Sequence, residues 1–279
     1  MITPAKWQAK GGQKNEEFRR DIVPYMKDIV YYPREKDVFD ISAMSGVTYF
    51  SVDKQVHNIK TIKNICSRRS EFNTSVNREI SDVLNNALIS ITDKVRNVKH
   101  IKINSSRTFF YRANQSTHGT VDRHDAIVMA GSSDGSKQVF KYAIASDLNN
   151  DSQIEKYKAI MSFKVSSFNE LEHDGRLIVL RPVKKYLPRE VCKDDFLVLR
   201  LSDSEAEIDS FISYMNTKFV SFLALCGNVG MNLSNEESWR FVPDPVNFDH
   251  IFTDQELYKK YNLTEEEIHI IESVIKERK

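Results

Sequence analysis

Short runs of β-branched and aromatic residues near the start of the chain are typical of strands. They predict strands over 28–32 and 47–52, and the segment 2–7 is typical of a strand end stopped by Pro4. Helical spacing of apolar residues predicts a helix over 15–23. Together these elements are typical of the last third of an α/β sheet, in which each apolar strand needs neighbours on both sides. We therefore expect the beginning of this sheet to lie outside the chain, and a small separate subdomain is the alternative.

Two longer helices are predicted further along the chain. Apolar side chains recur at helical spacing over 75–95 and over 204–226, which predicts a linking helix and a second long helix that ends at Gly227. A serine or threonine followed three residues later by glutamate marks three helix starts. These pairs are Ser204 with Glu207, Thr253 with Glu256, and Thr264 with Glu267. The last two pairs predict short helices near the end of the chain.

The stretch from 102 to 201 is irregular and rich in strand-forming residues, and we interpret it as a β-rich recognition domain. Its predicted strands are 108–112, 138–145, 157–163, 176–181 and 196–201. The chain then divides into a sheet portion over 1–55, a linking strand and helix over 56–100, and a recognition region with C-terminal helices over 101–279.

Composition favours a globular protein. Apolar residues make up 41% and charged residues 28% of the 279 positions, so neither disorder nor a fibrous repeat is favoured. No apolar run is long enough to cross a bilayer and no secretory signal is visible, so we expect a cytoplasmic protein without membrane association. Cys66, Cys192 and Cys226 are too widely spaced for a zinc knuckle, so we expect no metal.

The net charge of +1 hides a division along the chain. Between Lys54 and Arg112 there are twelve Lys or Arg and four Asp or Glu, whereas between Asp203 and Lys279 there are seven basic and fifteen acidic residues. A basic middle indicates contact with a polyanion, and a solvated charged helix face is the alternative.

Aromatic and basic side chains interleave over 107–112, and polar residues follow over 114–123. Asn, Gln and Arg read base edges through paired hydrogen bonds, while Lys and Arg neutralise phosphates. This pattern predicts DNA contact, and an ordinary edge strand is the alternative. Hydrolytic chemistry has less support, because His118 and His124 lack the spacing of a helical metal pair and no serine lies in a nucleophile elbow.

Several motifs follow one another in a characteristic order. Toward the end they are 213–223, 239–243, 252–258 and 263–268, and in the middle 156–158 and 191–193. Toward the start they are 1–7, 12–19, Asp37-Val38-Phe39 and 46–50. This order resembles the adenine-specific DNA methyltransferases of restriction-modification systems. The segments near the start resemble the strand, helix and last conserved block that follow the family's catalytic loop.

The resemblance implies an α/β remnant of a methyltransferase sheet followed by an α+β target-recognition domain. The full enzyme would transfer a methyl group from S-adenosylmethionine to the amine of an adenine flipped out of double-stranded DNA. An aromatic in the family's Val-Phe block helps to stack that adenine, which implies this role for Phe39, and a core phenylalanine is the alternative. Side-chain chemistry and position in the variable region give the DNA-contact candidates Arg107, Arg112, Gln115, Lys137, Lys141 and Lys164.

The chain departs from the family at the reaction centre. Gly11-Gly12 is its only glycine pair and lacks the spaced glycines of a cofactor-binding turn, and no Pro-Pro pair marks a catalytic loop. We therefore expect no catalytic residue and no cofactor in this chain, and no activity when it is alone. The expected partners are double-stranded DNA and an upstream methyltransferase fragment or a restriction subunit. The alternative is a non-catalytic interaction subunit or decoy of such a system.

Overall fold

The computed structural model describes most of the chain. The described residues are 1–8, 13–35, 38–39, 46–66, 70–103, 126–130, 140–144, 154–162, 176–192, 196–228, 233 and 236–277.

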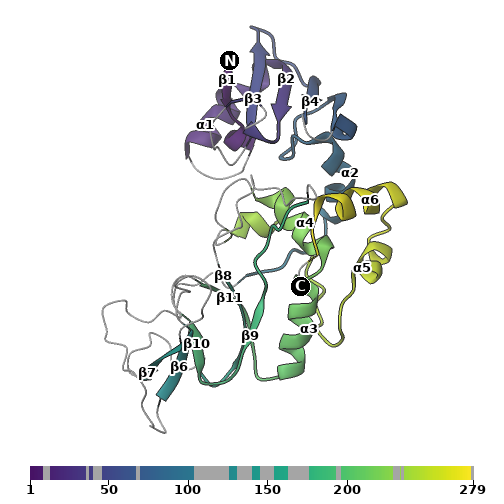
Figure 1. The fold of residues 1–279 in the computed structure, drawn as a ribbon. Coiled ribbons are helices and arrows are strands. Elements are labelled where there is room, and N and C mark those ends of the chain that lie inside the picture. Colours follow the sequence, from purple (N-terminus) through teal and green to yellow (C-terminus); the bar gives the residue numbers. More distant parts are fainter. Residues whose placement is uncertain are drawn as a thin grey trace.

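Five strands form a mixed sheet at the N-terminal end of the molecule, in the upper part of Figure 1. They are β1 (Ile2–Pro4), β2 (Met26–Tyr32), β3 (Val47–Val52), β4 (Lys60–Asn64) and β5 (Thr74–Arg78), in the spatial order β1-β3-β2-β4-β5. β3 is antiparallel to β1 and β2, while β2 and β4 are parallel. β1, β2 and β4 therefore run in one direction, and their carboxyl ends lie at the same edge.

One face of this sheet is covered by α1 (Gln13–Asp21) and by the short 3-10 helix η1 (Ala5–Gln8). Phe18 of α1 lies between Trp7 and Phe50, with ring centroids 5.7 and 6.0 Å away. A second 3-10 helix, η2 (Val23–Tyr25), leads into β2. The buried cluster consists of Ala5, Trp7, Met26, Ile29, Tyr31, Phe50, Ile62 and Leu84. The helix and the two strands predicted near the start are thus confirmed.

The opposite face of the sheet is open. Side chains alternate between the two faces of a strand, so the register row of Ile2, Tyr49 and Val30 lies opposite the buried Phe50 row. Ile2 is 66% and Tyr49 43% exposed, and the Tyr49 ring contacts Tyr32 at a centroid distance of 6.1 Å. The exposed Val52 and Val76 do not lie on this face, because they are in register with the buried Met26 and Ile62. The sheet therefore has a core on one side only.

The boundaries predicted for the sheet and the linking helix were wrong. β4 pairs with β2 and β5 pairs with β4, so the sheet extends to Arg78 rather than ending near residue 55. The helix predicted over 75–95 is a strand at its start, and α2 spans only Asn86–Val95. Asn85 caps α2 by accepting a hydrogen bond from the Ala87 amide. The helical spacing misled because Leu84 packs in the sheet core, whereas Ile91 packs in a different core.

Two three-stranded sheets follow α2 along the chain. One has the order β11-β8-β9 and the other β10-β6-β7. Their strands are β6 (Ala126–Ala130), β7 (Phe140–Ile144), β8 (Tyr157–Ser162), β9 (Lys184–Tyr186), β10 (Glu190–Cys192) and β11 (Phe196–Ser202). Strands predicted over 138–145, 157–163 and 196–201 match β7, β8 and β11. The strand predicted over 176–181 is wrong, since only a single bridge from Leu177 to Ile275 forms there, and 108–112 lies outside the described residues.

The helix predicted over 204–226 is two helices, α3 (Glu205–Met215) and α4 (Lys218–Gly227). Asn216 ends α3, and the Thr217 hydroxyl accepts a hydrogen bond from the Val220 amide to start α4. Thr217 is buried, and its hydroxyl also donates a hydrogen bond to the Tyr214 carbonyl at 2.8 Å. Thr217 therefore breaks the helix, although apolar residues continue on both sides of it.

The C-terminal helices pack on α4 and close the main hydrophobic core. The 3-10 helix η8 (Glu236–Trp239) precedes α5 (Asp254–Lys260) and α6 (Glu265–Val274), which confirms the two short helices. Thr253 caps α5, whereas Thr264 and Glu267 form the complete reciprocal capping box. Figure 1 shows α2 leading from the first sheet to this helical core, where Ile91 and Val95 are buried.

Candidate functional site

The structure describes two of the predicted site residues. Phe39 is 36% exposed, so it is not the core phenylalanine of the alternative interpretation. Lys141 lies in β7, opposite Met129 of β6. The remaining DNA-contact candidates, which are Arg107, Arg112, Gln115, Lys137 and Lys164, lie outside the described residues.

The carboxyl ends of β1 and β2 carry a polar cluster. Gln8 follows β1 through η1, and its side-chain oxygen accepts a hydrogen bond from the Leu84 amide at 3.3 Å. Tyr31 is near the end of β2 and is buried. Burial raises the pKa of Tyr31 to about 12. A hydrogen bond with the Gln8 side chain lowers the pKa and partly offsets this rise, whereas the nearby Glu35 charge adds to the rise. Gln8, Tyr31 and Glu35 are therefore close neighbours at this edge.

Glu35 is the least expected member of this cluster. Its side chain is fully buried, and among the described residues neither carboxylate oxygen has a hydrogen-bond partner. Its backbone carbonyl accepts hydrogen bonds from the amides of Val38 and Phe39, at 2.9 and 2.8 Å. This turn joins the buried carboxylate to two exposed apolar side chains. Sequence reasoning missed Glu35, because no local pattern shows that a glutamate after a strand is buried.

Asparagines at the carboxyl end of β4 fasten the start of α2 to the sheet. Asn64 donates to the Leu84 carbonyl at 3.0 Å and accepts from the Asn86 amide at 2.5 Å. The Asn86 side chain donates to the carbonyl of Ile62 and the hydroxyl of Thr74, at 2.9 and 3.0 Å. All these polar groups have partners within the chain, so this part of the edge is structural.

Several cations of the basic middle are committed to internal contacts. Arg78 binds the carbonyls of Val83 and Leu84 and the side chain of Asn86, and burial lowers its pKa to about 10. Lys60 is buried against the carbonyl of His57. Lys94 pairs with Glu267 and Arg96 with Asp82. The described cations of this stretch that are exposed without such a contact are Lys54, Lys63 and Lys102. The sequence count therefore overstates the charge available to a polyanion.

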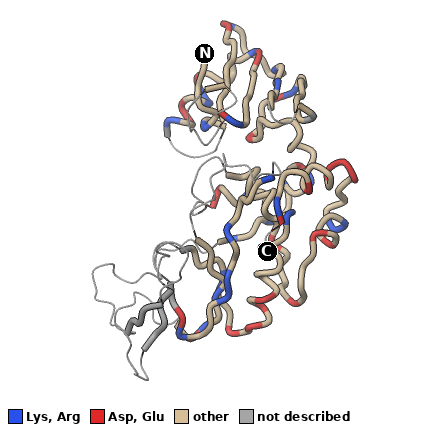
Figure 2. The backbone as a smooth tube through the Cα atoms, viewed as in Figure 1, with Lys and Arg blue, Asp and Glu red and all other residues tan. Residues whose placement is uncertain are grey.

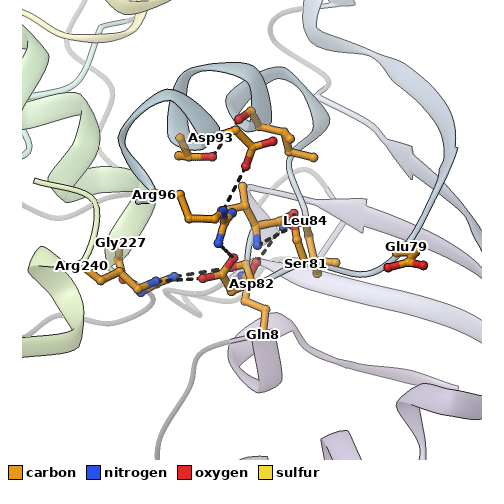
Figure 3. A network of polar contacts seen from close by, with 12 residues as sticks. Gln8, Glu79, Ser81, Asp82, Leu84, Asp93, Arg96, Gly227 and Arg240 are labelled. Carbon is orange, nitrogen blue, oxygen red and sulfur yellow. Dashed lines mark hydrogen bonds and ion pairs between the residues drawn. The ribbon is translucent and has the colours of Figure 1, made fainter. Parts of the chain in front are cut away.

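A buried ion-pair network joins the first sheet unit to the C-terminal helices (Figure 3). Asp82 accepts from Arg96 at 2.8 Å and from Arg240 at 3.3 Å, and its side chain is 5% exposed. Arg240 also donates to the carbonyl of Gly227, while Arg96 is held by Asp93 at 3.0 Å. Burial by itself would raise the pKa of Asp82, but the Arg96 hydrogen bond and the two arginine charges outweigh it and lower that pKa.

Acidic residues gather on the C-terminal helices in Figure 2, at the starts of α3, α5 and α6. Carboxylates at helix starts stabilise the helix dipole and repel phosphates. This surface is therefore a poor candidate for contact with a polyanion.

The described residues do not fit a site for S-adenosylmethionine. Their only glycines are Gly46, which precedes β3, and Gly227, which ends α4, so neither opens a helix after a strand. The end of β1 is filled instead by the buried side chains of Ala5 and Trp7. Within the described ranges, no three His, Cys, Asp or Glu side chains are grouped to hold a metal ion. In those same ranges no helix has the length and apolarity needed to span a membrane.

Comparison with known proteins adds no family assignment. No protein-family model matches the chain, and a search of curated proteins finds no significant match.

Proposed function

We propose that this chain is the DNA-recognition part of an adenine-specific DNA methyltransferase of a restriction-modification system, acting in the cytoplasm. A second polypeptide would supply the S-adenosylmethionine site and the catalytic loop. The full enzyme would transfer a methyl group to an adenine of double-stranded DNA, with Phe39 stacking on the extruded base.

The observation that carries the proposal is the half-covered sheet. β1 and β2 run in the same direction and are connected through α1, a connection typical of α/β sheets, with β3 between them and antiparallel to both. Within the described residues, Ile2 and Tyr49 stay exposed on the other face, and β1 is an edge strand. These two exposed apolar side chains form a surface that a partner could cover. The ordered motifs and the exposed Phe39 supply the link to DNA methylation.

The test is a titration of DNA binding against salt. The logarithm of the affinity of the purified chain for duplex DNA should fall with the logarithm of the salt concentration, by roughly 0.9 per phosphate contacted. Binding that is absent, or that is insensitive to salt, contradicts the proposal. Tight one-to-one uptake of S-adenosylmethionine by the isolated chain, measured by calorimetry, would contradict its division of labour.

The bare sheet face also favours a second function, that of a non-catalytic interaction subunit or decoy. In this case the chain would assemble with methyltransferase or restriction subunits without contacting DNA. Affinity capture of such subunits together with no retention on immobilised DNA would support this alternative over the first.

A further inference from the structure

We propose that one half of the open sheet face is the docking surface for a single amphipathic α-helix of a second polypeptide. This apolar half consists of the side chains that β1, β3 and β2 present on the open face, which are Ile2, Pro4, Val47, Tyr49, Val30 and Tyr32. The inference rests on one part of the proposed function, that a second polypeptide joins this chain, and it names the element that makes the contact.

The first argument is that the open face divides into two chemically different halves. Strands β4 and β5 present only polar side chains there, and all of them are exposed: Thr61, Lys63, Ser75 and Asn77. The Thr61 hydroxyl donates to the Asn77 side-chain oxygen at 3.0 Å. A sheet face that stays in water is normally polar along each strand. The polar half follows this rule and the apolar half departs from it, so a partner is expected over β1, β3 and β2 alone.

The second argument is the width of the apolar half. Neighbouring strands lie about 4.8 Å apart, so β1, β3 and β2 span about 10 Å from the first to the third. An α-helix with its side chains is about 10–12 Å across. A second sheet, including that of another copy of this chain, would extend over all five strands and would bury the polar half as well. The dimensions therefore favour one helix over a stacked sheet.

The third argument is the chemistry of the side chains. Tyr49 is 43% exposed and its ring contacts Tyr32 at a centroid distance of 6.1 Å, so the two tyrosines form a broad aromatic surface with polar tips. Tyrosine is enriched at protein interfaces for this combination. Lys63 is exposed and lies beside Val30, at the border of the apolar half. Charge complementarity therefore predicts an acidic side chain on the flank of the docking helix.

The experiment measures the binding of three fluorescein-labelled peptides to the full chain by fluorescence anisotropy. The first has about 18 residues, or five helical turns, with leucines at helical spacing and glutamates on both sides of this stripe. The second has lysines in place of the glutamates, and the third is the first with two interior prolines that prevent a helix. The wild-type chain should bind the acidic helix about threefold more tightly than the basic one. The proline peptide should not bind.

Three variants test which side chains make the contact. Tyr49→Ser should weaken binding of the acidic helix about tenfold or more, because a large interface side chain is lost. Val76→Ser is the matched control, since Val76 is 41% exposed on the same sheet but lies on the other face, in register with Ile62. It should leave binding unchanged. Lys63→Glu keeps the apolar half intact and should reverse the preference, so that the basic helix binds more tightly.

Each outcome decides. Equal binding of the proline peptide, equal effects of Tyr49→Ser and Val76→Ser, or an unreversed preference in Lys63→Glu overturns the inference. No helix binding together with salt-sensitive binding of duplex DNA overturns the inference and leaves the proposed DNA recognition standing. Helix binding that follows the expected order in a chain that does not bind DNA supports the inference and contradicts the proposed DNA recognition.

Discussion

Replacing Asp82 by asparagine should weaken the junction between the sheet unit and the C-terminal helices. The substitution preserves shape but removes the negative charge that lies between Arg96 and Arg240. Arg96 keeps Asp93 and is partly exposed, so its loss is small. Arg240 is only 10% exposed and would keep backbone carbonyls and the more distant Glu237 carboxylate, at 3.6 Å. Breaking a buried ion pair by removing one partner costs about 3–5 kcal/mol, and we expect about 3 kcal/mol here.

The assay is urea unfolding at neutral pH, followed by tryptophan fluorescence. The matched control is Asp93→Asn, whose carboxylate is 57% exposed and should contribute less than about 1 kcal/mol. The folded-state pKa of Asp82 is lowered, so its contribution is present above the ordinary aspartate pKa and is lost as pH falls through the folded value. The difference between wild type and Asp82→Asn should shrink accordingly in acid. If Asp82→Asn lost no more stability than Asp93→Asn, the reasoning about this junction would be refuted.

Three further changes test local features by urea or thermal unfolding. Thr217→Ala removes the cap of α4 and should cost about 1–2 kcal/mol; a loss near zero would show that the helix break has another cause. Gly46→Ala should destabilise the sheet unit by more than about 1 kcal/mol, because Gly46 has a φ of +71° and an added Cβ would lie 2.4 Å from the Tyr32 carbonyl oxygen. Burial opposes ionisation of Glu267, but the hydrogen bonds to Lys94, Thr264 and Ser90 and the Lys94 charge together outweigh it and lower the pKa of Glu267. Wild type should therefore lose stability as pH falls through that folded value, and Glu267→Gln should flatten this part of the pH profile.

Sequence reasoning succeeded where one local signal determined the element. β3 lies over the predicted 47–52, and α5 and α6 begin at predicted caps. Sequence reasoning failed where pairing with other strands, rather than a local signal, determines the element. β4 contains a single large apolar residue, Ile62, so nothing local marked it as a strand, and it is held between β2 and β5. The break at Thr217 was hidden because apolar residues continue on both sides of it.

Of the residues in the candidate site, only Phe39 could be identified from the sequence. Phe39 lies in a motif and could be singled out, and its side chain is exposed. Glu35 could not be found in this way, because a lone glutamate is normally solvated and only the fold buries it. The charge count also misled, since Arg78 and Lys60 are used inside the molecule.

The asparagine contacts at the start of α2 also limit how the molecule can bend. The first turn of this helix is bonded to the sheet, while Ile91 and Val95 are buried among the C-terminal helices. A helix of ten residues is about 15 Å long and resists flexing over that length. The helix therefore holds the sheet unit at a fixed distance from the helical core, so a base bound near Phe39 would also be kept at a fixed distance from that core. Rotation of the sheet unit relative to the core would first require the asparagine hydrogen bonds to the sheet to break.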